Sequence, residues 1–123
     1  NALYVPEGQW ASCPHESSDV RWIGTDDTTT CQSLVLVGRE GVAAAHLNDA
    51  ESSAAGLLAM VDAVAGVVPG STAASVDAFL VGGMDNGRPG ELSFKTAAAV
   101  LGSLASHPLV ITLRLAAVCS LNK

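Results

Sequence analysis

The chain has little of what several large classes of function require. Its 123 residues include only six Lys and Arg, against twelve Asp and Glu, and its formal net charge is −6. Since nucleic-acid binding depends on clustered basic side chains that neutralise phosphates, we expect no nucleic-acid partner. No apolar run reaches the roughly 18 residues of a membrane-spanning helix. We therefore expect no membrane partner either.

Cysteine is also scarce. Cys13, Cys31 and Cys119 are odd in number and stand in no CxxC or Cys/His spacing. This pattern argues against a disulfide framework and a metal site, and it favours a reducing compartment. We expect no metal, no cofactor and a cytoplasmic protein, with the nucleus as the second location. The oligomeric state stays open.

Aromatic side chains make up 4% of the chain, whereas hydrophobic residues, mainly small and branched ones, make up 49%. Such a composition suits tightly packed α/β layers and excludes a disordered tail. The length is enough for one core, so we expect residues 1–123 to form a single α/β domain. Strand-like residues begin at once and the last strand-like run is soon cut off. We therefore expect a fragment of a longer protein, truncated at both ends.

The apolar pattern predicts the order β-β-β-β-α-β-α-β. The expected strands cover residues 3–5, 20–23, 31–37, 42–47, 75–83 and 109–118, and the expected helices cover 48–68 and 91–106. Residues 9–19 are polar and contain a proline, so we expect a loop there. The first strands are expected to form a meander and the later ones to be joined through helices. This gives a mixed sheet or sheets with two helices packed on one side.

The apolar side chains of the two helices recur at helical spacing. In the first helix the expected buried face carries Leu57, Val61, Val64 and Val68, and the helix is expected to stop at Pro69–Gly70. In the second helix the expected buried face consists of Phe94, Ala98, Leu101 and Ala105.

The most informative segment is Gly24–Cys31, a polar and acidic loop that runs into the apolar strand 31–37. His46 follows on the next strand. If the hairpin between them turns on Arg39 and Glu40, paired residues have numbers that sum to 79 and Cys31 lies one diagonal step from His46. A sum of 77 places the two directly opposite each other, whereas a sum of 78 places them on opposite faces of the sheet.

A thiol and an imidazole on one face form a candidate nucleophile and base, because the imidazole can take the thiol proton. Loop N–H groups can hold a developing oxyanion. Asp26 and Asp27 are candidates for binding a substrate cation or orienting His46, and Thr29 and Thr30 for bonding the substrate amide. The pattern indicates acyl transfer from an amide or ester through a thioester to water.

Structural roles also stay open for these residues. Cys31 and His46 are compatible with a buried core position, and Asp26 and Asp27 with turn chemistry. Gly82 and Gly83 follow a strand without any nucleotide-binding motif. We expect their backbone to approach the loop before Cys31 closely, and we count them among the substrate-binding candidates.

Three segments, Ile23–Cys31, His46–Asp49 and Leu80–Met84, resemble the eukaryotic protein N-terminal asparagine amidohydrolases. That family has Gly-Ser-Asp-Asp-x-Thr-Thr-Cys around its nucleophile and a later Leu-Val-Gly-Gly-Phe. This chain differs in having Thr25 in place of Ser and Met84 in place of Phe.

The resemblance implies that Cys31 is the nucleophile and that His46 is the base. It implies a cysteine-dependent amidohydrolase that converts the N-terminal Asn of a polypeptide to Asp and ammonia, which feeds the N-degron pathway. Two alternatives remain: a non-catalytic recognition or assembly module of the same fold, and a glutamine deamidase.

Overall fold

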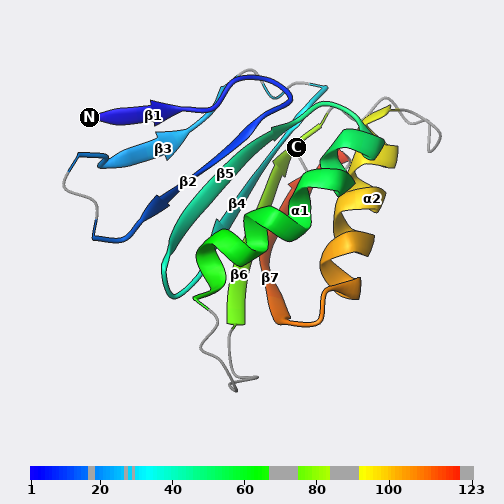
Figure 1. Ribbon diagram of the computed structural model, residues 1–123. Helices are drawn as coiled ribbons and strands as arrows, with labels where there is room; N and C mark the ends of the chain where they lie inside the picture. The colour runs from blue at the N-terminus through cyan, green and yellow to red at the C-terminus, as the bar shows by residue number, and fades with distance from the viewer. Residues whose placement is uncertain (17–18, 27, 29, 67–74, 84–91, 120–123) are drawn as a thin grey trace.

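The computed structural model describes residues 1–16, 19–26, 28, 30–66, 75–83 and 92–119 (Figure 1). Within them lie seven strands and two helices: β1 (Ala2–Tyr4), β2 (Trp10–Pro14), β3 (Trp22–Gly24), β4 (Gln32–Val37), β5 (Gly41–Leu47), α1 (Ala50–Ala65), β6 (Ser75–Gly82), α2 (Leu92–Ser106) and β7 (Val110–Val118). The predicted fold class, mixed sheets with two helices, is confirmed. No described helix is both long and apolar enough to cross a membrane.

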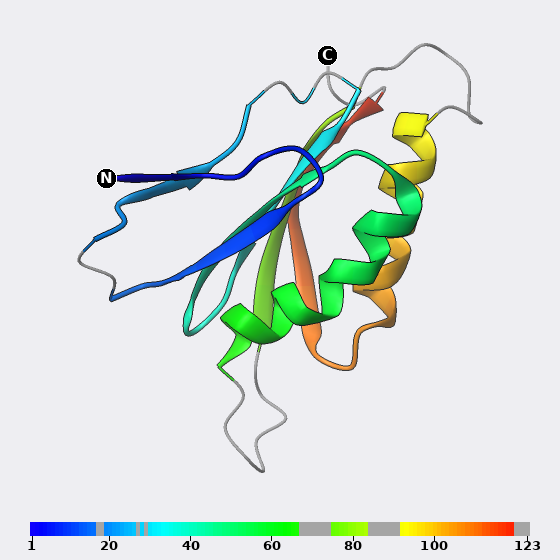
Figure 2. The same cartoon turned by 45° about the horizontal axis from the view of Figure 1, so that its top comes forward.

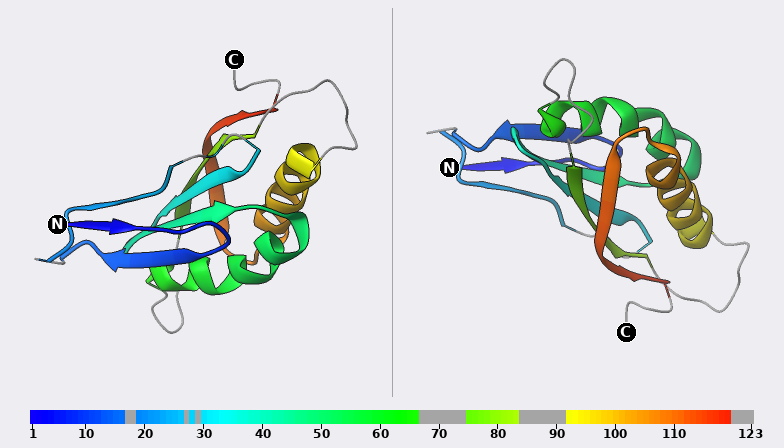
Figure 3. Two further views of the ribbon diagram at one scale, coloured as in Figure 1. Left: turned by 90° about the horizontal axis from the view of Figure 1, so that it is seen from above. Right: turned by 90° about the horizontal axis from the view of Figure 1, so that it is seen from below.

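The strands form two sheets. The larger has the order β2-β5-β4-β6-β7, with β6 and β7 parallel and the other neighbours antiparallel, and the smaller is a parallel ribbon of β1 and β3. Both helices cover one face of the larger sheet, which is clearest in Figure 2. The β1–β3 ribbon lies on the opposite side, as the two views of Figure 3 show.

The first part of the chain differs from the expected pairing. Residues 10–14, expected as loop, form the edge strand β2. The segments expected as the first two strands do pair with each other, as β1 and β3, but they are parallel and form a separate sheet, so they do not continue into β4 as a meander. The polar residues that follow this short strand and Pro14 at its end concealed it. Both are compatible with an edge strand, which has only one paired neighbour and tolerates proline.

The β4–β5 hairpin has the register predicted for a turn on Arg39 and Glu40. The N–H of Gly38 donates to the carbonyl of Gly41 over 3.0 Å, and Ser33 stands opposite His46. The alternatives with sums of 77 and 78 are therefore wrong. Because side chains alternate along a strand, this register places Ser33 and His46 on one face, and Cys31 joins them if the alternation continues back to it.

The core lies between the larger sheet and the helices. Leu34 and Leu36 of β4 alternate with half-buried residues and face α1, whose Leu57, Val61 and Val64 are buried as predicted. Each such side chain contributes roughly 1.5–3 kcal/mol through burial. The predicted Val68 and the stop at Pro69–Gly70 lie outside the described residues.

The buried face of α2 is not the predicted one. Phe94 is 50% exposed, Ala98 and Ala105 are exposed, and Leu101 is half-buried. The face that packs inward carries Ser93, Thr96, Ala97, Val100 and Leu104. Small side chains there allow α2 to approach α1, and Ser93 donates a hydrogen bond to the carbonyl of Thr30 just before the central strand β4.

The hairpin turn is fixed to the end of α1. The N–H of Glu40 donates to the carbonyl of Val64 over 3.0 Å. A β-carbon on Gly38 would collide with that same carbonyl. Glycine at position 38 is therefore a condition for docking the turn against the helix.

We expect Gly38→Ala to destabilise the fold by about 1–3 kcal/mol, since the backbone it meets must move. Gly102→Ala is the matched control, because Gly102 is an exposed helical position with open space around it. It should stabilise by about 0.5–1 kcal/mol. Urea unfolding of the two variants measures both effects, and equal changes would contradict the packing described.

Candidate active site

Four segments meet at the end of the hairpin remote from its turn. They are the turn between β1 and β2, the loop between β3 and β4, the last residues of β5 and the end of β6. Each brings one part of the site to the sheet face opposite the helices or to its edge.

Cys31 stands one residue before β4. It is half-buried, which leaves its thiol accessible to a substrate. Continued back to position 31, the register Ser33↔His46 makes Cys31 and His46 diagonal neighbours on the same face, a relation that sets α-carbons roughly 7–8 Å apart. The register predicted for the hairpin is confirmed, and the same-face placement of Cys31, which precedes the paired residues, stays a prediction.

The imidazole of His46 is held by a chain of two hydrogen bonds. Its Nδ1 lies 2.7 Å from Oγ1 of Thr25, whose hydroxyl donates to the carbonyl of Val5 over 2.7 Å. Since that hydroxyl has a single proton, the geometry assigns the proton of the neutral ring to Nδ1, as donor to Thr25. The lone pair is then left on Nε2.

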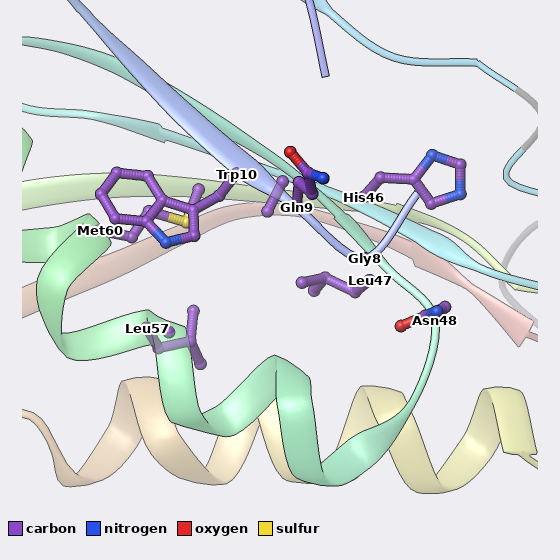
Figure 4. A pocket seen from close by; sticks show the side chains of 10 residues that line it. Gly8, Gln9, Trp10, His46, Leu47, Asn48, Leu57 and Met60 are labelled. Carbon is purple, nitrogen blue, oxygen red and sulfur yellow. The ribbon is translucent and has the colours of Figure 1, made fainter. Parts of the chain in front are cut away.

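Nε2 of His46 is buried and has no hydrogen-bond partner among the described residues. The whole residue is 3% exposed. Figure 4 shows its ring projecting away from the apolar side chains of Leu57 and Met60 that line the neighbouring pocket under α1. A nitrogen with a free lone pair is able to accept a proton from a neighbouring group.

The backbone of the loop before Cys31 is anchored by residues at the end of β6 and at the start of α2. The N–H of Gly83 donates to the carbonyls of Thr28 over 3.2 Å and Cys31 over 2.9 Å, and the Ser93 hydroxyl donates to the Thr30 carbonyl over 2.8 Å. The loop is therefore tied to the end of β6 and to the first turn of α2.

Gly82 and Gly83 make this approach possible. Both have positive φ, 110° and 80°, and a β-carbon on Gly82 would lie 2.8 Å from the Cys31 carbonyl oxygen. The close backbone approach expected of these glycines is confirmed. Their contact with substrate stays a prediction.

This anchoring also orients the amide of Cys31. In a trans peptide the C=O and the following N–H point in opposite directions, and the described peptides include no cis bond. Because the Thr30 carbonyl points to Ser93, the N–H of Cys31 points away from α2. This amide is the structure's candidate donor to an oxyanion.

Glu7 is a neighbour of the nucleophile that the sequence did not indicate. Its Oε1 lies 3.9 Å from Sγ of Cys31. Burial raises the pKa of the Cys31 thiol, a hydrogen bond with the Thr30 side chain lowers it, and the charge of Glu7 raises it further. These effects together favour the protonated thiol of Cys31 over its thiolate.

The other predicted site residues fall in different places. Asp26 is exposed and accepts a hydrogen bond from the Tyr4 hydroxyl over 2.8 Å, so the partner of His46 is Thr25 instead. Thr30 is exposed beside Cys31. Asp27 and Thr29 lie outside the described residues.

Two positions important to the geometry, Glu7 and Thr25, were missing from the predicted site. Thr25 belongs to the polar segment before Cys31, and its hydroxyl in a loop facing His46 was the available signal. Glu7 offered none, because it precedes Cys31 by 24 residues and follows a different strand. Within the described residues no group of three His, Cys, Asp or Glu side chains is placed to hold a metal ion.

The comparisons give this arrangement a family. The family model for the protein N-terminal asparagine amidohydrolase matches residues 1–123. A match over the entire chain places the protein among the amidohydrolases. The chain belongs to the protein N-terminal asparagine amidohydrolase family. A search of the curated proteins found no match.

The raised pKa of Cys31 predicts how the thiol responds to pH. Since the thiolate is the reactive form, alkylation of Cys31 by iodoacetamide should increase with pH through a midpoint above the roughly 8.5 of a free thiol. Glu7→Gln should move that midpoint down by removing the negative charge. Peptide mapping by mass spectrometry follows Cys31 separately from the other cysteines. A wild-type midpoint below the free value would contradict this description.

Proposed function

We propose that the protein hydrolyses the side-chain amide of an N-terminal asparagine on a polypeptide, through a thioester on Cys31. One observation carries the proposal: the register Ser33↔His46 brings His46, held by Thr25 and with Nε2 unpartnered among the described residues, to the end of β4 that Cys31 precedes. Membership of the amidohydrolase family supports the substrate class.

The first half of the reaction forms the thioester. Nε2 of His46 takes the proton of the Cys31 thiol as Sγ attacks the carboxamide carbon, and a C–S bond forms while the carbonyl oxygen becomes an oxyanion. The N–H of Cys31 donates to that oxygen. The oxyanion then collapses, the C–N bond breaks, and His46 returns its proton to the leaving nitrogen, which departs as ammonia.

The second half uses the same groups. Nε2 takes a proton from a water molecule as its oxygen attacks the thioester carbon. The C–S bond breaks, the sulfur recovers the proton from His46, and the side chain leaves as a carboxyl group. One amide and one water thus become one acid and one ammonia, with N-terminal Asp as the product.

A resting thiol of raised pKa makes His46 a general base rather than the partner of a standing thiolate. Proton transfer and attack then occur together. The negative charge of the neighbouring Glu7 must be neutralised when substrate is bound. In a cell this reaction would supply N-terminal Asp to the N-degron pathway, and the composition supports a cytoplasmic or nuclear setting.

We expect Cys31→Ala to abolish release of ammonia from a peptide that begins with Asn, lowering kcat/KM by at least roughly 10³-fold. Mass spectrometry of the peptide, which detects the exchange of an amide NH2 for OH, provides the measurement on the full-length protein. Cys13→Ala is the matched control, since Cys13 is another half-buried free thiol but pairs with Val42 near the hairpin turn.

Full activity in Cys31→Ala would rule out the thioester. The other readings give different outcomes: a recognition module would bind the Asn peptide without converting it, and a glutamine deamidase would convert a Gln peptide faster than the Asn peptide.

The role of Thr25 predicts a conservative rescue. Thr25→Val removes the acceptor for His46 Nδ1–H and should lower kcat by roughly 10²-fold with little change in KM, because the ring loses its orientation and tautomer. Thr25→Ser keeps the hydroxyl and should retain most of the activity. A loss in Thr25→Ser as large as that in Thr25→Val would contradict this role, and retained activity in Thr25→Val would show that the methyl group, not the hydroxyl, is what His46 requires.

A further inference from the structure

The carboxylate of Glu7 lies where its negative charge disfavours ionisation of the neighbouring Cys31 thiol. Its Oε1 is 3.9 Å from Sγ of Cys31, and no Lys, Arg or His pairs with it among the described residues. A negative charge at this distance disfavours the thiolate that forms during attack. A site with this arrangement gains from Glu7 only if the substrate itself brings a positive charge.

Glu7 is exposed, but the backbone that carries it is firmly placed. It occupies the second position of a turn in which the N–H of Gln9 donates to the carbonyl of Pro6 over 3.1 Å, with Gly8 at φ 77°. A positive φ at the third position, filled by glycine, is typical of a type II turn. The backbone of the turn makes two hydrogen bonds with the backbone of His46. The N–H of Gly8 donates to the His46 carbonyl over 2.9 Å, and the N–H of His46 donates to the Gln9 carbonyl over 3.0 Å.

We propose that Glu7 binds the α-ammonium group of the N-terminal asparagine. The proposal rests on the proposed function and names the group that recognises the free terminus. In asparagine three bonds separate the α-nitrogen from the carboxamide carbon, a span of roughly 3–4 Å. With an ammonium–carboxylate hydrogen bond of about 2.8 Å and an attack distance of about 3–3.5 Å, one asparagine of this span can contact both Oε1 of Glu7 and Sγ of Cys31, which are 3.9 Å apart.

The same geometry bears on which amide is accepted. In glutamine one more bond separates the two groups, so the same span between ammonium and carboxamide carbon is reached only with a more folded side chain. Asp26, the other acidic candidate described, already accepts the Tyr4 hydroxyl and has no recorded contact with Cys31. The observations therefore favour Glu7 over Asp26.

Binding of the ammonium also changes the nucleophile. Once its charge is neutralised, Glu7 no longer opposes ionisation of Cys31. The free terminus therefore affects the chemical step as well as binding. A substrate lacking the ammonium leaves the sulfur facing an uncompensated carboxylate.

The test compares two peptides on the full-length protein: one that begins with Asn, and the same peptide begun by a succinamoyl group, which is Asn without its α-amino group. Ammonia release gives kcat/KM for each. We expect wild type to prefer the free amine by about 10- to 100-fold. Glu7→Gln should bring this preference near unity, losing rate on the amine while keeping or gaining rate on the succinamoyl peptide.

Controls separate charge from folding. Glu7→Asp should recover part of the preference, while Glu16→Gln, at an exposed acid in the β2–β3 connection, and Asp26→Asn should keep all of it. A preference unchanged in Glu7→Gln, or one lost in Asp26→Asn instead, would overturn the proposal while leaving the proposed function intact. Conversion of neither peptide by wild type would overturn the proposed function, and this proposal with it.

Discussion

The register of one hairpin determines most of the site. The two-residue turn at Arg39 and Glu40 can pair β4 and β5 in only one way, and that pairing sets Ser33 opposite His46. A slip of one residue would move His46 to the face that packs on α1, where Leu47 and Ala45 now lie, and place a polar ring in the core. The apolar packing that stabilises the fold thus also holds the imidazole at the end of β4 that Cys31 precedes. The bond between Glu40 and the end of α1 fixes the turn that sets this register.

On one side of the hairpin, hydrogen bonds anchor the loop before Cys31, and on the other side hydrogen bonds orient the ring of His46. On the helix side, Gly83 and Ser93 donate the hydrogen bonds that hold the loop carbonyls of Thr28, Thr30 and Cys31. On the other side, the β1–β3 ribbon supplies Thr25 and the carbonyl of Val5, which orient His46. Because both sides act through hydrogen bonds to backbone or buried groups, the segments that carry Cys31 and His46 are held in position before any substrate arrives. Such preorganisation is the main contribution a protein makes to this kind of reaction.

What the sequence could predict follows the range of the interactions. The hairpin, its register and the buried face of α1 depend on local periodicity and turn chemistry, so they were predictable. The strand β2 was not, since an edge strand needs neither continuous apolar residues nor freedom from proline. The inward face of α2 is set by contact with α1 and by the reach of Ser93 to Thr30, and an alanine-rich helix has too little contrast to reveal it. Glu7 meets Cys31 only through the tertiary fold, so no local pattern announced it.

The electrostatics of the site run opposite to those of a thiol enzyme with a standing ion pair. There, a lowered thiol pKa keeps the nucleophile charged before substrate binds. Here, burial and Glu7 both raise the pKa of Cys31, which favours the neutral thiol over the reactive thiolate. An acidic group next to the nucleophile then acts as a condition on the substrate, since only a terminus that brings its own positive charge removes the penalty. Hydrolysis would turn the amide into a carboxylate three bonds from the ammonium group that Glu7 is proposed to bind. The two carboxylates would then lie close together, and like charges at that range repel. The group that admits the substrate would therefore also favour release of the product.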